Sequence, residues 1–305
     1  MISRRGLIGA GAAALAAPGL SHVAVRPKTL RVAHMTDFHI QPELHANEGS
    51  HKALAHAMGQ KPDLILSGGD HVMDAFAQTE ARTRLQWELF DWLRKDHVNV
   101  PMQAALGNHD VWGWFKKESA TDGSEPLWGK RWFCDFWGLP RTYHSFDQGA
   151  WHFVVLDNIK TVVGEAYDGE IDPEQMEWLK DDLARTKRPT LVMSHIPLLS
   201  VTSLALGYDP RPRSFIVTSG LMTNNLADVL ALFQANPQVK IALSGHTHRI
   251  DRVDYDGVAY LCGGAVCGNW WKGPVDRFKP GYRILDLHED GTFGEAFHEW
   301  GWTPA

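Results

Sequence analysis

Two histidines follow an apolar segment in the C-terminal half of the chain, where residues 240–248 read Lys-Ile-Ala-Leu-Ser-Gly-His-Thr-His. The apolar run stops at Gly245, and His246 and His248 come directly after it. Neutral imidazole is the commonest metal ligand, and a glycine in front of it lets the backbone turn tightly toward an ion. Taken alone, the stretch fits a pair of solvated loop histidines as well as it fits a metal site.

The same arrangement occurs four more times, with an apolar run that ends at a small residue before a metal-binding side chain. Residues 30–39 end on Asp37 and His39, residues 63–70 on Asp70, residues 101–110 on Asn108, His109 and Asp110, and residues 190–195 on His195. In open α/β sheets, ligands bind outside the carboxyl ends of the strands, so five such ends can meet at one crevice. Seven side chains would suit two ions there: Asp37, His39, Asp70, Asn108, His195, His246 and His248.

Together these motifs resemble those of the calcineurin-like metallophosphoesterases. The matching motifs are Asp37-Phe-His39, Gly69-Asp70, Gly107-Asn108-His109-Asp110, His195 and Gly245-His246-Thr247-His248, in the family's order. The resemblance implies that Asp37, His39, Asp70 and His248 hold one metal ion. It implies that Asp70, Asn108, His195 and His246 hold the other, so that Asp70 bridges them. It also implies an α/β fold, a four-layer αββα sandwich of two mixed β-sheets flanked by helices.

Such a centre would attract a phosphate group. Two divalent ions against two carboxylates leave a local charge of about +2, or about +1 with a bridging hydroxide, in a chain whose formal charge is -6. Ions roughly 3.5 to 4 Å apart can share a hydroxide near neutral pH and clamp the phosphoryl oxygens. We therefore predict binuclear metal-dependent hydrolysis of a phosphoester. The mixed nitrogen and oxygen ligands admit divalent or mixed-valence Mn, Fe, Zn or Co.

The departing alkoxide needs a proton, and His109, beside Asn108, is predicted to supply it. Asp110, or another nearby carboxylate, is expected to fix the tautomer of that imidazole. His71 is a candidate for substrate contact, although a hydrogen-bonded supporting role beside Asp70 is the preferred interpretation. Four tryptophans are further candidates for the substrate pocket: Trp112, Trp114, Trp270 and Trp271.

Differences from other members of the family favour a phosphodiesterase. In protein serine/threonine phosphatases the motif of the bridging aspartate continues to Asp-Arg, whereas residues 70–75 read Asp-His-Val-Met-Asp-Ala. Purple acid phosphatases place a tyrosine ligand where Met73 stands. The pattern is closer to bacterial cyclic-nucleotide and glycerophosphodiester phosphodiesterases, so we expect a small or lipid-linked phosphoester. The alternatives are a broad-specificity phosphomonoesterase and, less favoured because all ligands are present, a non-catalytic metal-binding scaffold.

The composition is that of a globular protein with one large core, with 305 residues of which 44% are hydrophobic and 22% charged. The acidic charge balance argues against a nucleic-acid partner. Residues 1–25 carry Arg4 and Arg5 before a stretch rich in alanine and glycine, which predicts a twin-arginine signal, with a disordered basic N-terminus as the alternative. The signal implies the twin-arginine export machinery as a partner and a periplasmic or otherwise extracytoplasmic location.

The three cysteines, Cys134, Cys262 and Cys267, cannot form a disulfide framework. Cys262 and Cys267 are interpreted as buried free thiols, although a bridge between them in an oxidising compartment stays open. The oligomeric state is also open.

Residues 26–305 are predicted to form the metallophosphoesterase domain. Insertions at about 111–142 and 196–224 leave the strand ends at Asn108 and His195, and long loops at such ends often form lids or specificity walls. The tryptophans of the first insertion are expected mostly to form a small core of their own. Predicted strands are 30–36, 63–67, 99–106, 151–157, 189–194, 239–244, 281–287 and 292–299, with a hairpin over 252–260 that turns at Asp256-Gly257. Predicted helices are 48–59, 78–96, 172–185 and 225–235.

Overall fold

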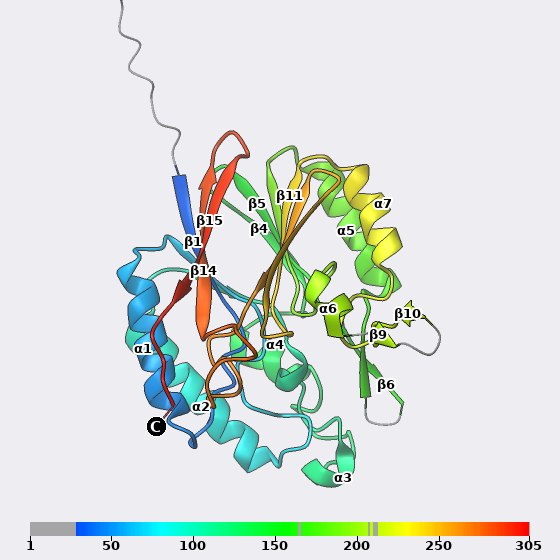
Figure 1. Ribbon diagram of the computed structural model, residues 1–305. Coiled ribbons are helices and arrows are strands. Elements are labelled where there is room, and N and C mark those ends of the chain that lie inside the picture. Colours follow the sequence, from blue (N-terminus) through cyan, green and yellow to red (C-terminus); the bar gives the residue numbers. More distant parts are fainter. Residues whose placement is uncertain (1–28, 164–165, 207, 210–212, 305) are drawn as a thin grey trace, which may run out of the picture.

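The computed structural model describes residues 29–163, 166–206, 208–209 and 213–304. Figure 1 shows two β-sheets face to face with helices on both outer sides, which confirms the four-layer αββα sandwich. The twin-arginine segment lies outside the described residues. Among the helices that are described, none is long and apolar enough to cross a lipid bilayer.

Five strands form the first sheet: β1 (Thr29–Met35), β2 (Leu64–Ser67), β3 (Met102–Ala104), β14 (Gly281–His288) and β15 (Phe293–Glu299). They lie in the order β15-β14-β1-β2-β3. β1, β2 and β3 are parallel, and β14 runs antiparallel to β1 and to β15. The outer face is covered by α1 (Ala46–Gly59) and α2 (Glu80–His97).

Six strands form the second sheet: β4 (His144–Gln148), β5 (Trp151–Val155), β8 (Thr190–Met193), β11 (Val239–Ser244), β12 (Ile250–Tyr255) and β13 (Val258–Gly263). Their order is β12-β13-β11-β8-β5-β4, with the four central strands parallel and both edge strands antiparallel. Two helices, α5 (Pro173–Arg185) and α7 (Leu226–Gln234), cover its outer face (Figure 1).

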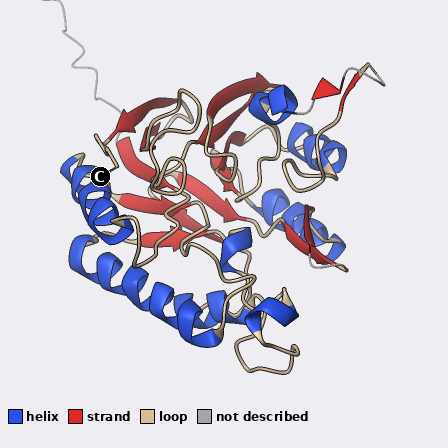
Figure 2. Cartoon of the chain, turned by 60° about the horizontal axis from the view of Figure 1, so that its bottom comes forward, coloured by secondary structure: helices blue, strands red, loops and turns tan. Residues whose placement is uncertain are grey.

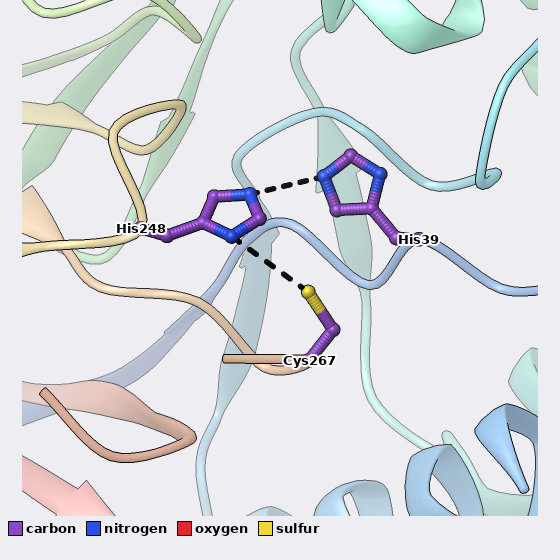
Figure 3. Close-up of side chains that lie close together, drawn as sticks. All are labelled: His39, His248 and Cys267. Carbon is purple, nitrogen blue, oxygen red and sulfur yellow. Dashed lines mark hydrogen bonds between the residues drawn. The ribbon is translucent and has the colours of Figure 1, made fainter. Parts of the chain in front are cut away.

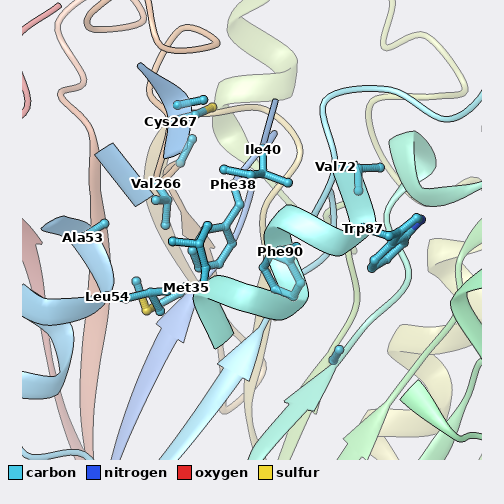
Figure 4. Packing of buried hydrophobic residues seen from close by; sticks show 14 of the residues in the cluster. Met35, Phe38, Ile40, Ala53, Leu54, Val72, Trp87, Phe90, Val266 and Cys267 are labelled. Atoms are coloured by element: carbon cyan, nitrogen blue, oxygen red, sulfur yellow. The ribbon is translucent and has the colours of Figure 1, made fainter. Parts of the chain in front are cut away.

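Successive side chains of a strand point to opposite faces of its sheet, so each strand serves two cores. On β1, Val32 packs between the two sheets, whereas Met35 packs toward the helices. Figure 4 shows Met35 with Leu54 of α1 and Phe90 of α2 in this outer core. A third core lies between the second sheet and its helices and contains Val154, Leu183 and Phe233, among others.

A local sequence signal places the start of α5 correctly. The Asp172 side chain accepts a hydrogen bond from the Gln175 N–H at 2.9 Å, and Pro173 opens α5. Not every apolar side chain of α2 faces the core, since Leu85 is 41% exposed. The buried face of α2 is instead built on Trp87, Phe90 and Leu93, among others.

The two insertions carry short elements. The first contains α3 (Lys116–Ser119) and α4 (Arg131–Trp137), and its rings pair with one another, with Trp112 and Trp132 5.0 Å apart and Trp114 and Trp128 5.2 Å apart. The second contains α6 (Val201–Leu206), β9 (Tyr208–Asp209) and β10 (Ser214–Phe215). A hairpin of β6 (Ile159–Val162) and β7 (Ala166–Gly169), which the sequence did not predict, lies near them (Figure 1).

His34 on β1 is a buried histidine outside the predicted ligand set. Its side chain is fully buried, and neither ring nitrogen has a hydrogen-bond partner among the described residues. Burial and the neighbouring charge of Arg283 lower the pKa of His34 to about 3. Because the folded chain holds the ring neutral, this group contributes stability above the ordinary pKa of 6.5, and the contribution is lost as the pH falls toward 3.

We expect the free energy of unfolding of the wild type to fall by roughly 2 kcal/mol more between pH 7 and pH 5 than that of a His34→Asn variant. Urea unfolding at the two pH values measures the difference, and comparing pH dependences removes the constant cost of the smaller side chain. A His45→Asn variant, which changes an exposed histidine, serves as the control and should keep the wild-type pH dependence. Identical pH dependence in His34→Asn would contradict the assignment.

Candidate metal centre

Five loops at the carboxyl ends of strands meet at one edge of the sandwich. Three leave β1, β2 and β3 of the first sheet, and two leave β8 and β11 of the second. Figure 2 brings this loop-rich edge forward. Backbone hydrogen bonds join the loops, as from the Asp37 N–H to the Gly69 carbonyl and from the Gly245 N–H to the His195 carbonyl, both at 3.0 Å.

Five of the predicted ligands have left-handed backbone conformations. Their φ angles are 57° at Asp37, 44° at His39, 53° at Asp70, 69° at His246 and 55° at His248. Residues other than glycine rarely adopt this region, and those that do cluster at functional sites because the surrounding structure enforces it. The loops therefore hold these side chains in place at a conformational cost.

The first predicted ligand set converges on one point. His39 Nε2 lies 3.1 Å from His248 Nε2 and 3.5 Å from Asp70 Oδ2. His248 Nε2 lies 3.3 Å from Asp37 Oδ1. All four side chains are buried.

The second set converges next to it. His195 Nε2 lies 3.1 Å from Asp70 Oδ2, 3.1 Å from Asn108 Oδ1 and 3.3 Å from His246 Nδ1. The same Asp70 oxygen thus approaches histidines of both sets. The structure brings all seven predicted ligands together, with Asp70 in the shared position.

Contacts on the far side of the rings suit metal binding. The Nδ1–H groups of His195 and His248 donate to the carbonyls of Gly68 and Gly268, at 2.8 and 2.5 Å. A carbonyl only accepts, so each Nδ1 keeps its hydrogen and Nε2 is the nitrogen that faces the other ligands. Figure 3 shows His248 between His39 and Cys267, whose Sγ is 4.0 Å from His248 Nδ1. Cys262 and Cys267 are both buried free thiols.

Two glycines allow the loops to approach one another. A Cβ at Gly107 would stand 2.1 Å from the Asp70 backbone nitrogen, and one at Gly245 would stand 2.1 Å from Thr36 Oγ1. Both distances are far below contact distance, so any side chain would push the ligand loops apart. These glycines are required for close packing around the centre.

The electrostatics favour ionised carboxylates. Burial would raise the pKa of Asp37, but the His248 ring beside it outweighs this effect and lowers the pKa to about 2. Asp70 is also buried, and His195 and His109 hold its pKa well below the usual range. Burial, together with His195, lowers the pKa of His246 to about 3 and keeps that ring neutral. Burial alone would lower the pKa of His195 and His248, but Asp70 raises that of His195 to about 9, and Cys267 and Asp37 raise that of His248. Ionised carboxylates bind cations directly, and a bound cation would replace the extra proton of each of these two rings, so the residues fit a pair of cations.

The predicted role of Asp110 was wrong. Its carboxylate accepts hydrogen bonds from the Gly107 N–H at 2.9 Å, the His71 N–H at 2.8 Å and the His71 ring at 2.8 Å. It therefore fixes the backbone around Asp70 instead of orienting His109. His109 donates from Nδ1 to the Met73 carbonyl at 2.6 Å, which leaves its Nε2 to carry an exchangeable proton.

His71 is not a substrate contact. The side chain is fully buried, and its Nε2 lies 2.8 Å from the Ser67 hydroxyl while Nδ1 binds Asp110. This position agrees with the preferred interpretation, in which His71 supports the loop of Asp70 through hydrogen bonds.

A pocket of about 440 Å³ opens over the metal ligands. Of the four candidate tryptophans, Trp270 lines it, with its ring centre 4.8 Å from that of His248. The other three do not. Trp271 is buried and donates to the carbonyls of Phe38 and His39 at 3.1 and 3.0 Å, while Trp112 and Trp114 pair with other rings of the first insertion and pack against the outer core of the first sheet.

Sequence reasoning missed several residues of the pocket wall. Tyr167 comes from the unpredicted β6–β7 hairpin, and its ring lies 6.0 Å from that of His246. Burial and the charge of Asp70 raise the pKa of its hydroxyl, which therefore stays protonated. Arg249 directly follows the ligand His248, and this adjacency was a signal that could have been used. The remaining missed residues are Leu221, Thr247, Val275 and Asp276.

The comparisons with known proteins agree with this geometry. The model of the calcineurin-like phosphoesterase family matches residues 30–249. A probable cyclic nucleotide phosphodiesterase of Synechococcus sp. is 26% identical over 282 residues, which cover 88% of this chain and 92% of that protein. The 3',5'-cyclic adenosine monophosphate phosphodiesterase CpdA of Escherichia coli is 30% identical over 168 residues, which cover 53% of this chain and only 55% of that protein.

Among solved structures, a dimetal phosphatase from Danio rerio has the same fold, with a TM-score of 0.59 and 12% identity over 89% of this chain and 99% of that one. The family, with the converged ligand sets, implies two metal ions. The chain therefore belongs to the calcineurin-like phosphoesterase family and is a metal-dependent hydrolase of phosphoesters.

Proposed function

We propose that the chain hydrolyses a phosphodiester that carries a planar or apolar group on one side of the phosphate. The observation that carries this proposal is the charge of the pocket wall. Arg249 is the one arginine or lysine among the described residues that line it, and its guanidinium is paired with Asp276 at 2.9 Å. A monoester dianion would gain little binding energy from this wall, because the wall offers no unpaired cationic side chain among its described residues. A diester monoanion needs less positive charge for binding.

The second ester group of a diester needs an apolar surface to pack against. Trp270 is 37% exposed at the pocket, and Tyr167, Leu221 and Val275 add further apolar surface. A planar group of the substrate, such as an aryl ring or a nucleobase, can stack on the indole of Trp270. The names of the relatives from Synechococcus sp. and Escherichia coli, both cyclic-nucleotide phosphodiesterases, support the same substrate class.

The residues divide the reaction between them. Two divalent cations, when bound, supply an activated water and neutralise the phosphoryl oxygens. The mixed donor set favours Mn, Fe, Zn or Co for these ions. His109, with Nδ1 held by the Met73 carbonyl, presents Nε2 to the pocket and gives its proton to the leaving oxygen. Tyr167 also lines the pocket, and its protonated hydroxyl can donate a hydrogen bond to a phosphoryl oxygen.

A comparison of aryl substrates tests the proposal. We expect purified protein with its metal content measured to show a higher kcat/KM on bis(p-nitrophenyl) phosphate and 3',5'-cyclic AMP than on p-nitrophenyl phosphate. The broad-specificity phosphomonoesterase is the alternative, and it would show the opposite order. Metal-loaded protein without turnover on any of the three would favour the non-catalytic scaffold.

Trp270→Ala should raise KM for an aryl diester while kcat changes little. Loss of an aromatic stacking surface costs about 1 to 3 kcal/mol of binding, which corresponds to roughly 5- to 150-fold in KM. Trp270→Phe keeps an aromatic ring and should restore most of the affinity. Trp92→Ala, which removes an exposed indole outside the pocket, is the matched control. An unchanged KM in Trp270→Ala would exclude the stacking role.

We also propose that the enzyme acts outside the cytoplasm on a small or lipid-linked substrate. Support comes from the sequence of residues 1–25, with Arg4 and Arg5 before an alanine- and glycine-rich stretch. Twin-arginine export carries folded proteins, which suits an enzyme whose metals bind during folding. Cell fractionation should find the wild type in the periplasm and an Arg4→Lys, Arg5→Lys double variant in the cytoplasm. Equal distribution of the two would contradict the export proposal.

A further inference from the structure

A second group of metal-binding side chains lies outside the active-site pocket, where α1 meets the last turn of α2. It consists of His51 from α1 with Asp96 and His97 from α2. His51 Nδ1 contacts His97 Nε2 directly. Asp96 Oδ2 lies 3.5 Å from His97 Nε2 and 3.9 Å from His51 Nδ1. We propose that these three side chains form a separate, surface binding site for a divalent transition-metal ion such as Zn²⁺.

The donors suit that ion. Two imidazole nitrogens and one carboxylate oxygen, with a water in the fourth position, make a tetrahedral set that zinc accepts. The direct contact of the two ring nitrogens leaves the Asp96 oxygen outside good hydrogen-bond distance, whereas a cation that moves the two rings apart can bind all three groups. The side chains of His51, Asp96 and His97 are 26%, 53% and 20% exposed, so an ion and its water can reach them.

Charges around the group favour a cation. His97 is the last residue of α2, and the carboxyl end of an 18-residue helix carries partial negative charge. Arg94 and Lys95 in the same turn are both paired with Asp91. Within the part of the chain that the structure describes, the Asp96 carboxylate pairs only with the two histidines. It is therefore available to an ion.

The site joins two helices, so occupancy has a physical consequence. α1 and α2 lie side by side over the first sheet, and one ion held by both would link them (Figure 1). A ligand that binds only the folded chain raises its stability. Trp92, 50% exposed, stands edge-on to the His51 ring with 4.5 Å between ring centres and can report binding.

Zinc stoichiometry tests the inference. After dialysis against micromolar Zn²⁺, the wild type should hold one more ion per chain than His51→Ala or His97→Ala, and Zn²⁺ should raise the unfolding midpoint further in the wild type than in these variants. His45→Ala, which changes the exposed histidine directly before α1, should bind like the wild type. Turnover on an aryl diester should be unchanged in all three variants, which separates this site from the catalytic centre.

Trp92 gives an independent measurement. Zn²⁺ should change the Trp92 emission of the wild type, and Trp92→Phe should lose this change while it binds the same number of ions. If His51→Ala or His97→Ala folds poorly, Asp96→Asn can replace it in the test. This change at an exposed carboxylate should weaken zinc binding without disturbing the helices. Equal zinc content in the wild type, His51→Ala and His97→Ala would overturn the proposal.

Discussion

His109→Ala is expected to reduce kcat about 10² to 10⁴-fold while both metal ions stay bound. The ring lies beside the ligands, and its Nδ1 is held at 2.6 Å by the Met73 carbonyl, so Nε2 is the atom that carries the transferable proton. Alanine removes that proton but leaves the seven ligands in place. Steady-state kinetics with elemental analysis of the same sample measures both quantities.

The leaving group provides the control for this prediction. A weakly basic p-nitrophenolate leaves without much protonation, so the variant should lose less activity on aryl esters than on substrates with an alkoxide leaving group. His45→Ala at the surface should behave like the wild type on both. Because His109 also lies near His39 and Asp70, a ligand role is the competing explanation, and loss of an ion in His109→Ala would establish it.

Asp70→Asn is expected to remove at least one metal ion and to reduce turnover at least about a hundredfold. Asp70 Oδ2 lies 3.1 Å from His195 Nε2 and 3.5 Å from His39 Nε2, between the two ligand sets. An asparagine cannot supply a negative oxygen to both sets. Elemental analysis after dialysis against metal-free buffer measures the loss.

This substitution should leave the fold intact, which makes the measurement clear. Asp70 Oδ1 accepts the His109 N–H at 2.8 Å, and an asparagine oxygen can keep that hydrogen bond. Asp91→Asn, which changes a carboxylate on the surface of α2, is the matched control and should retain full metal content. Two ions per chain in Asp70→Asn would mean that the carboxylate does not bridge.

The sandwich followed from the family resemblance, and the seven side chains that the structure brings together were readable because their motifs are local signals. A glycine directly before a predicted ligand, as at Gly107 and Gly245, indicates where two loops must approach each other closely. The helix that starts at Asp172 was equally readable from its cap and its proline. Such signals lie within a few residues of the feature they specify.

Features that depend on tertiary contacts were not readable. Nothing near Tyr167 in the sequence indicates that its hairpin turns toward His246. Asp110 follows His109 directly, yet its carboxylate faces His71 and the loop after β2, because the short 3₁₀ turn at Asn108–Asp110 directs neighbouring side chains apart. Trp270 and Trp271 are adjacent, and only packing against the backbone of His39 decides which of them is buried.

Each predicted ion would draw donors from both sheets, since one set joins Asp37 and His39 with His248 and the other joins Asn108 with His195 and His246. The separation of the sheets is fixed by side chains such as Leu66 and Met193 that never touch an ion. The volume of the core between the sheets therefore sets the distance between the donors that each ion would bind. We therefore expect the affinity for a cation to depend on how well this core is packed. Substitutions that enlarge the core should favour larger ions.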